Sequence, residues 1–219
     1  MTMRAVFAEA IATAFLLIAV VGSGIMAERL AGGNVALALL ANALATGGAL
    51  FALIVAFGPQ SGAHMNPLVT LAAAIIGEFP RRSVPAYIAA QTVGAVVGVW
   101  ITHAMFGSPI IEFGSHVRTG AGQWIAEAVA TFGLLTIIAG AKTQSIHVIA
   151  AVVATYIMGA YWFTASTSFA NPAVTLARAL TDSFAGIRPS DAPGFILAQI
   201  AGFLGALGWM VGGMKRLPR

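Results

Sequence analysis

The sequence contains no cysteine and very little charge. Its 219 residues include seven acidic and eleven basic side chains, so only 8% of the chain is charged while 59% is hydrophobic. Without cysteine, the chain can form no disulfide bond, iron–sulfur cluster or thiolate zinc site. Without more charge, it cannot cover itself with a water-exposed surface, which excludes a water-soluble enzyme. The composition therefore predicts a membrane protein.

Three long stretches carry no charged residue: 30–77, 83–111 and 143–177. A helix needs about 20 apolar residues to cross the roughly 30 Å hydrocarbon core of a bilayer. Transmembrane β-strands would alternate polar and apolar residues over about 10 positions, whereas these stretches are apolar on every side. We therefore expect an all-α membrane protein. Its six predicted spans are 5–27, 35–57, 84–106, 122–141, 145–164 and 192–213.

Two further apolar segments are too short to cross a membrane, and both begin with the same dipeptide. After Asn66-Pro67 about eleven apolar residues follow, which make about 17 Å of helix at 1.5 Å per residue. An equally short segment follows Asn171-Pro172. Asparagine is a favoured N-cap and proline suits the first helical turn, so both dipeptides predict helix starts. Each segment is expected to be a half-helix that reaches halfway through the membrane.

The half-helices belong to an internal repeat. Three short motifs recur in the same order: 8–13 as 126–131, 66–71 as 171–176, and 90–91 as 198–199. Each repeat holds three spans, an odd number, so the second repeat must be inverted relative to the first. We expect one domain over 1–219, with repeat one near 5–108 and repeat two near 122–213. The two half-helices would then point their N-termini at the membrane midplane.

The basic side chains lie between and after the spans rather than on one face. Despite a pI near 10.1, this distribution speaks against nucleic acid as a partner and indicates orientation in a lipid bilayer. With the N-terminus inside the cell, the inner segments hold seven basic residues and the outer segments four. We expect a multi-pass protein of the cell membrane with both termini cytoplasmic. The first apolar run is too long for a signal peptide and is interpreted as a retained span.

The point where the half-helices meet is expected to be a pore. Irregular backbone is stable inside a membrane only where protein buries it or where it lines a watery cavity. Each helix N-terminus offers free N–H groups and about half a positive charge, and Asn66 and Asn171 add side-chain amides. Water and alcohols can accept hydrogen bonds there, whereas a cation meets two positive helix ends. The sequence thus predicts passage of small uncharged solutes.

Over essentially its whole length, the chain resembles the aquaporin, or major intrinsic protein, family. The stretch Ser61-Gly62-Ala63-His64-Met65-Asn66-Pro67 resembles the family's first box, although Leu68 replaces the usual alanine. Asn171-Pro172-Ala173 matches the second box fully. The resemblance implies an aquaporin-like right-handed bundle, assembled as a homotetramer of independently conducting pores.

The resemblance also assigns the narrowest part of the pore, the selectivity filter, to Thr46, Gly159, Ser168 and Val174. Family members usually have an arginine where this sequence has Val174, and water-selective members use an aromatic residue and often a histidine at other filter positions. All four residues here are small and uncharged. By resemblance to relatives with relaxed filters, the channel is expected to admit glycerol-type solutes and undissociated metalloids such as arsenite or methylated arsenicals.

Other candidate residues have a structural and a functional interpretation. In this family, glutamates such as Glu9 and Glu127 hold the backbone of the pore loops, which is favoured here over a proton relay. His64 is expected to hydrogen-bond the first loop rather than to gate the pore by protonation. Arg178 is expected to pair with Asp182 at i+4, with a place in the pore vestibule as the alternative.

Three motifs are interpreted as purely structural. The aromatic run 161–163 at the outer end of the fifth span is expected to anchor the membrane interface. Glycines 94, 98, 208 and 212 are expected to allow close helix packing. Gly22-Ser23-Gly24 lacks the positioned His-Asp pair that an intramembrane protease needs, so no catalytic residue is assigned.

We expect neither a metal nor a cofactor, because the histidines lie far apart in the sequence and in membrane depth. Two other functions stay open. One is a mainly water-conducting aquaporin. The other is an ion-coupled secondary transporter, because inverted repeats with broken helices also build carriers. A carrier would need a coupling carboxylate near the midplane, and only the symmetric Glu9 and Glu127 are available.

Overall fold

In the computed structural model, which describes residues 2–213, the chain is all helical. Within this part of the chain, six helices are long and apolar enough to cross a membrane. They are α1 (Met3–Leu30), α2 (Val35–Ser61), α4 (Val84–Phe106), α5 (Ala121–Ala141), α6 (Ile146–Phe163) and α8 (Ala192–Gly213). The all-helical fold and the six predicted spans are confirmed.

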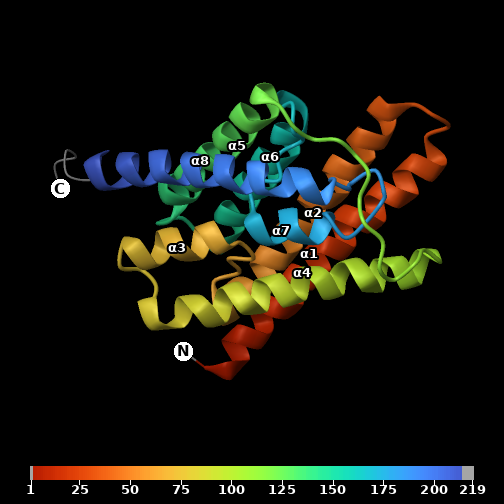
Figure 1. Cartoon of the computed structure of the whole chain (residues 1–219). Helices are drawn as coiled ribbons and strands as arrows, with labels where there is room; N and C mark the ends of the chain where they lie inside the picture. The colour runs from red at the N-terminus through yellow and green to blue at the C-terminus, as the bar shows by residue number, and fades with distance from the viewer. Residues whose placement is uncertain (1, 214–219) are drawn as a thin grey trace.

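Two short helices, α3 (Pro67–Ile75) and α7 (Pro172–Arg178), lie between α8 and α4 in the view of Figure 1, with α3 toward the end of the bundle where α4 begins. Asn66 caps α3 and Asn171 caps α7, each through its side-chain oxygen. Both predicted helix starts are therefore confirmed. The helices contain nine and seven residues, fewer than the eleven expected, because the chain turns directly after each.

The long helices form two groups that mirror the repeat. α1 packs against α2 and α4 in the first group, and α5 packs against α6 and α8 in the second. The groups meet where α2 contacts α6. α1 begins and α8 ends at the same end of the bundle (Figure 1), as an even number of crossings requires. Single-turn 3-10 helices, η1 (Arg81–Ser83) and η2 (Pro189–Asp191), lead into α4 and α8.

Glycine allows the closest helix crossing in each group. A Cβ atom at Gly94 or Gly98 of α4 would lie 2.2 or 2.3 Å from a carbonyl oxygen of α1. A Cβ atom at Gly202 of α8 would lie 2.2 Å from a carbonyl oxygen of α5. The packing role predicted for Gly94 and Gly98 is confirmed. Gly208 and Gly212 meet nothing within 4 Å in the described chain, and Gly202 makes the equivalent contact instead.

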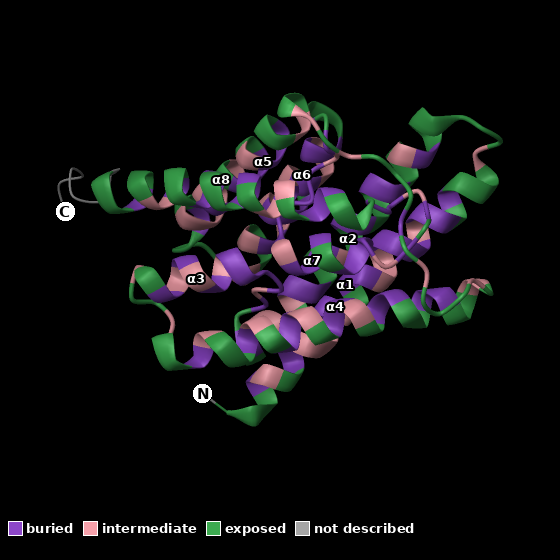
Figure 2. Cartoon of the chain, in the orientation of Figure 1, coloured by how far each residue is buried: buried purple, intermediate pink, exposed green. Residues whose placement is uncertain are grey.

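Burial separates the inside of the bundle from its outer faces (Figure 2). Apolar side chains such as Phe7, Leu44 and Leu197 are more than half exposed, a surface that suits lipid rather than water. The carboxylates of Glu9 and Glu127 lie at the opposite extreme, with 0% exposure inside the bundle. A buried charge is stable only with hydrogen-bond partners, so these two residues lead to the functional site.

Candidate solute pathway

A cavity of about 300 Å³ lies between α1, α2, α5, α6 and the two half-helices. Aliphatic side chains of the long helices supply most of its wall. Polar groups on the wall are few and include Thr46, Asn66, Ser168 and Asn171. An apolar wall with a small number of placed polar groups is typical of sites that bind small molecules.

The asparagines that start the half-helices face each other's loops. The Asn66 side-chain nitrogen donates a hydrogen bond to the Ala170 oxygen at 2.8 Å, and the Asn171 nitrogen donates to the Met65 oxygen at 2.7 Å. A carboxamide nitrogen carries two hydrogens. Each asparagine therefore retains one N–H that no residue of the described chain accepts, and both residues line the cavity.

The loops before the half-helices share an irregular backbone. Ala63 and Met65 in the first loop both have a φ of 48°, and Ser168 and Ala170 in the second have φ values of 52° and 48°. Left-handed angles of this kind cost a residue other than glycine about 1–3 kcal/mol each. The loops therefore need strong external support.

Two buried glutamates give that support. Glu9 in α1 accepts hydrogen bonds from the backbone amides of His64 and Met65 at 2.9 and 2.8 Å. Glu127 in α5 accepts hydrogen bonds from the two amides before Asn171, at 2.8 and 2.9 Å. Each glutamate thus holds the loop that precedes one half-helix.

A glutamine completes each support. The Gln91 side-chain nitrogen donates to Glu9 at 2.8 Å and to the Thr70 hydroxyl at 2.9 Å. Gln199 makes the equivalent two bonds in repeat two, at 2.6 and 2.8 Å. The sequence shows these glutamines only as matching positions of the repeat. Because Gln91 and Gln199 occupy equivalent positions in the two repeats, the repeat itself could have indicated that both bind the equivalent glutamate.

His64 lines the cavity and hydrogen-bonds to α3, the half-helix that follows its loop. A ring nitrogen of His64 lies 3.1 Å from the Thr70 hydroxyl, and the ring packs edge-on against Phe79 and Tyr87. The third residues of the two boxes, Leu68 and Ala173, are both buried in the protein. The next residue in each half-helix, Val69 or Val174, lines the cavity.

Three of the four expected filter residues, Thr46, Ser168 and Val174, line the cavity. Gly159 is not part of the described wall, and a Cβ atom there would lie 3.5 Å from the Phe163 ring. Two residues turn a helix by about 200°, so Tyr161 lies on a different face of α6 from Gly159, and it is Tyr161 that contributes to the wall.

Tyr161 gives the cavity wall an aromatic ring. Its side chain is 3% exposed, lines the cavity and shares a hydrogen bond of 3.3 Å with the Thr46 hydroxyl. The interpretation of Tyr161 as an interface anchor is therefore wrong. Trp162 and Phe163, the other members of the aromatic run, are 49% and 58% exposed.

The predicted pair of Arg178 with Asp182 does not form. α7 ends at Arg178, so Asp182 is not on the helix and the i+4 geometry is absent. Asp182 instead accepts hydrogen bonds from the Ser115 amide and hydroxyl at 2.9 and 2.7 Å. These bonds lower the pKa of the Asp182 carboxyl. Arg178 lines the cavity instead.

The cavity wall carries charged groups near both of its ends. Near the end where α3 stops, Glu78 and Lys142 both contribute to the wall and form an ion pair of 2.8 Å. Near the end where α7 stops, the wall includes Arg178. The charges at the first end therefore form an ion pair, whereas the second end carries the cationic side chain of Arg178.

An all-helical bundle in which two opposed half-helices begin at asparagines beside one cavity defines a membrane channel. The sequence profile of the family described as major intrinsic protein matches residues 1–170. The chain therefore belongs to the major intrinsic protein family of membrane channels and is not an enzyme.

Individual relatives agree with this assignment. The chain is 50% identical to "Aquaglyceroporin AqpS" of Rhizobium meliloti (strain 1021) over 208 residues, which cover 94% of this chain and 88% of that protein. It is 35% identical to "Aquaporin NIP1-4" of Oryza sativa subsp. japonica over 65% of this chain and 51% of that protein. The solved structure of the aquaglyceroporin from Plasmodium falciparum has the same fold, with a TM-score of 0.73 at 22% identity over 97% of this chain and 96% of that one.

Proposed function

We propose that this protein is a passive channel for small neutral solutes, namely glycerol-type polyols and undissociated metalloid acids such as arsenite. The observation that carries the proposal is the pair Asn66 and Asn171. Each offers an N–H without a protein acceptor, and both lie in one cavity at the positive ends of α3 and α7. A relative that is 50% identical carries the name aquaglyceroporin, which supports the choice of solute class.

Conduction follows from the exchange of water for solute at the two amides. A hydroxyl oxygen of a polyol accepts the N–H of one asparagine and then that of the other, so the solute loses few hydrogen bonds on its way. A cation gains nothing at these donors and meets the positive ends of two helices. No step needs an ion gradient, because none of these groups has to change its charge.

The second part of the proposal concerns the filter, formed by Thr46, Tyr161, Ser168 and Val174. The Ser168 hydroxyl is buried, and no residue of the described chain accepts or donates a hydrogen bond to it. An unpaired buried hydroxyl costs about 1–3 kcal/mol, which a passing solute can recover. Val174 supplies an apolar surface beside it. Undissociated arsenite and methylated arsenicals combine hydroxyl groups with a compact body, as glycerol does.

A mainly water-conducting channel is the second candidate. The sequence predicted only small residues in the filter, whereas the aromatic ring of Tyr161 lines the cavity and would narrow the pathway. Stopped-flow measurements on proteoliposomes with water, glycerol, urea and arsenite distinguish the two. We expect glycerol and arsenite flux well above that of protein-free liposomes. Water flux with no solute flux would support the second candidate and contradict the first.

Asn171→Asp tests the pathway itself. A carboxylate lacks the N–H donors and adds a negative charge, so we expect solute flux to fall at least tenfold. Asn34→Asp is the matched control, because Asn34 caps α2 at an exposed position and aspartate caps a helix equally well. Unchanged flux in an intact Asn171→Asp protein would remove Asn171 from the pathway.

We also propose that the protein is a homotetramer of the cell membrane with both termini cytoplasmic. The apolar outer faces of the helices leave surface for lipid and for neighbouring copies. Cross-linking in native membranes would measure the number of copies. Protease protection of a C-terminal tag in sealed vesicles would report the side on which the C-terminus lies.

A further inference from the structure

We propose that Arg178 is the charge filter of this channel, displaced one helical turn from the position of Val174. Its guanidinium repels cations, and its terminal amino groups donate hydrogen bonds to the oxygens of passing solutes. The inference rests on the proposed function, because it concerns the selectivity of the same pathway.

Arg178 has an unusual position for a charged residue. It is the last residue of α7, its side chain is 2% exposed, and it lines the cavity. Val174, four residues earlier, lines the same cavity, and residues four apart lie on one face of a helix. The wall therefore carries an apolar side chain and, about 6 Å further along the helix axis, a cationic one.

The charge of Arg178 is not neutralised by a carboxylate. No acidic residue of the described chain lies within ion-pair distance of it. The acidic residues of the surrounding segments have other partners: Glu127 binds loop amides, and Asp182 binds Ser115.

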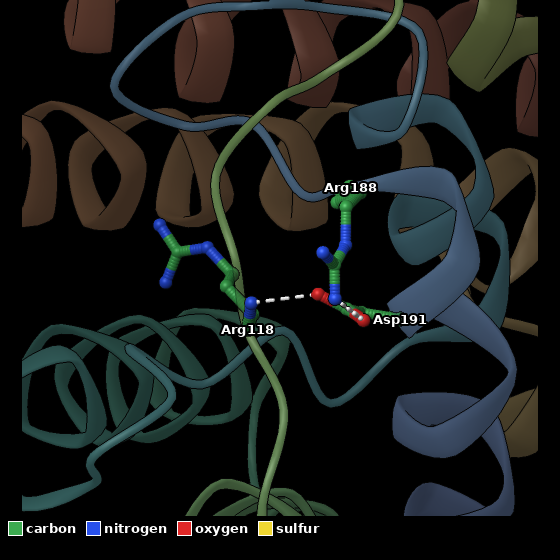
Figure 3. A network of polar contacts seen from close by, with 3 residues as sticks. All are labelled: Arg118, Arg188 and Asp191. Carbon is green, nitrogen blue, oxygen red and sulfur yellow. Dashed lines mark hydrogen bonds and ion pairs between the residues drawn. The ribbon is translucent and has the colours of Figure 1, made fainter.

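Asp191 is also occupied. Figure 3 shows Asp191 in an ion pair with Arg188 at 2.8 Å, while its second oxygen accepts the backbone amide of Arg118 at 2.9 Å. The guanidinium of Arg118 points away from Asp191 in the same view. It donates instead to the carbonyl oxygens of Gly186, Ser166 and Phe184. Arg118 thus fixes the loops, and its charge adds to that of Arg178.

Arg178 also keeps donors for a solute. Its Nε donates to the carbonyl oxygen of Ala185. The two terminal amino groups carry four further hydrogens, and no residue within 2–213 accepts a hydrogen bond from them. Donors on the cavity wall without a protein acceptor need a polar occupant of the cavity. Water fills this role at rest and solute oxygens fill it during passage.

An aromatic ring holds the guanidinium in place. The Phe169 ring centroid lies 3.3 Å from the central guanidinium carbon of Arg178 and 5.2 Å from that of Arg118. Phe169 in turn packs edge-on against Phe195. Stacking on a ring favours the charged group and leaves the in-plane amino hydrogens available. Arg178 also lies at the C-terminal end of α7, where the helix dipole favours a cation.

The geometry of a guanidinium indicates which solutes benefit. Its planar fork of donors matches two acceptor oxygens that lie close together, on one atom or on adjacent atoms. Polyols and undissociated oxyacids present such oxygens, whereas urea presents one. Arg178 is therefore expected to favour the first two classes over urea and to exclude cations.

Arg178→Gln tests the charge, because it keeps polar donors and removes the positive charge. We expect sodium and proton leak through proteoliposomes to rise about 30-fold, from Coulomb repulsion at about 8 Å and an effective dielectric constant of about 20. Arg188→Gln is the matched control. Arg188 is neutralised by Asp191 and is not part of the cavity wall, so its leak should equal that of the wild type.

Arg178→Lys gives a second test within a single folded protein. At pH 7 the introduced ammonium keeps the charge, so cations should stay excluded. As the pH rises and the lysine loses its proton, cation leak should increase. The wild type should show no such increase, because arginine stays protonated. This comparison remains decisive if Arg178→Gln fails to assemble.

The ratio of glycerol to urea flux tests the donors. We expect both variants to lower this ratio at least twofold, because neither side chain has the guanidinium fork. Leak in Arg178→Gln equal to that of the wild type, or pH-independent exclusion in Arg178→Lys, would overturn the charge filter. A wild-type protein that conducts no neutral solute would overturn the proposed function itself, which is a separate outcome.

Discussion

The loops before α3 and α7 are built alike where they hold the fold and differently where they meet the solute. In both loops a buried glutamate binds two backbone amides, a glutamine binds the glutamate, and a threonine of the half-helix binds the glutamine. A serine hydroxyl also accepts a backbone amide in each loop, at Ser61 and at Ser166. These shared contacts explain how two strained loops persist inside a membrane.

The differences lie on the cavity wall. His64 and Phe169 both stand two residues before an asparagine, but His64 bonds to Thr70 whereas Phe169 stacks on Arg178. Ala73 and Arg178 both stand seven residues after an asparagine, and both line the cavity. At this position of the cavity wall, repeat one thus has the neutral Ala73 and repeat two has the cationic Arg178. The symmetric residues support the fold, and we propose that the asymmetric ones set selectivity.

The largest effect is expected from breaking the shared support. Glu9→Gln or Glu127→Gln turns one oxygen that accepts a buried N–H into a donor, which costs about 1–3 kcal/mol for each unpaired group. A shift of 1 kcal/mol lowers the melting temperature of a chain of this size by about 2–4 °C. We expect both variants to lose several degrees and most of their flux, as thermal unfolding in detergent and liposome assays would measure.

The symmetry makes this prediction strict. Because the two networks match, the two substitutions should cost similar amounts, and Glu28→Gln at an exposed position should cost almost nothing. A large loss in only one of the two variants would show that the second network is not a structural counterpart of the first.

Val174→Arg and Val69→Arg sharpen the comparison next, because both valines line the cavity at equivalent positions. Val174→Arg adds bulk and a second charge beside Thr46, Tyr161 and Arg178. We expect glycerol and arsenite flux to fall at least tenfold more than water flux. Val69→Arg should reduce all three fluxes by similar factors. The same ratio of solute to water flux in both variants would place the filter elsewhere.

A smaller effect is expected at the hydrogen bond between Thr46 and Tyr161. Tyr161→Phe removes one hydroxyl and keeps the ring, which costs about 1 kcal/mol. We expect the ratio of glycerol to water flux to change about two- to fivefold, with no change in assembly. Tyr156→Phe on the same helix is the control, because Tyr156 is not part of the cavity wall. Equal effects of the two substitutions would argue against a role of Tyr161 in the filter.

The smallest effect concerns the loop contact between Ser115 and Asp182. Hydrogen bonds from Ser115 lower the pKa of the Asp182 carboxyl in the folded protein. The contact therefore stabilises the fold above the unfolded pKa of about 3.9 and is lost as the pH falls through the lower folded value. Because Asp182 is exposed, the contribution is small. Ser115→Ala should slightly lower thermal stability at pH 7, and the difference from the wild type should shrink in acid.

Local signals made the scaffold predictable from the sequence. Uncharged stretches define the spans, and an asparagine before a proline fixes each half-helix start, because capping depends only on neighbouring residues. The role of the glutamates was predicted from the family resemblance, with their matching positions in the repeat as support. Arg178 and Tyr161 could not be placed in the same way. Arg178 could pair with Asp182 only if α7 continued to Asp182, and the helix ends at Arg178 instead. On α6, the rotation of the helix decides whether Gly159 or Tyr161 faces the cavity. Both depend on packing between distant segments.

The central claim is that neutral solute passes between the half-helices without any driving ion. Its most direct test is glycerol uptake into proteoliposomes over a wide range of glycerol concentrations, with and without sodium or proton gradients. We predict that the initial rate rises linearly with the glycerol gradient and is identical in all ionic conditions. Uptake that saturates, or that requires an ion gradient, would contradict the channel and favour a carrier.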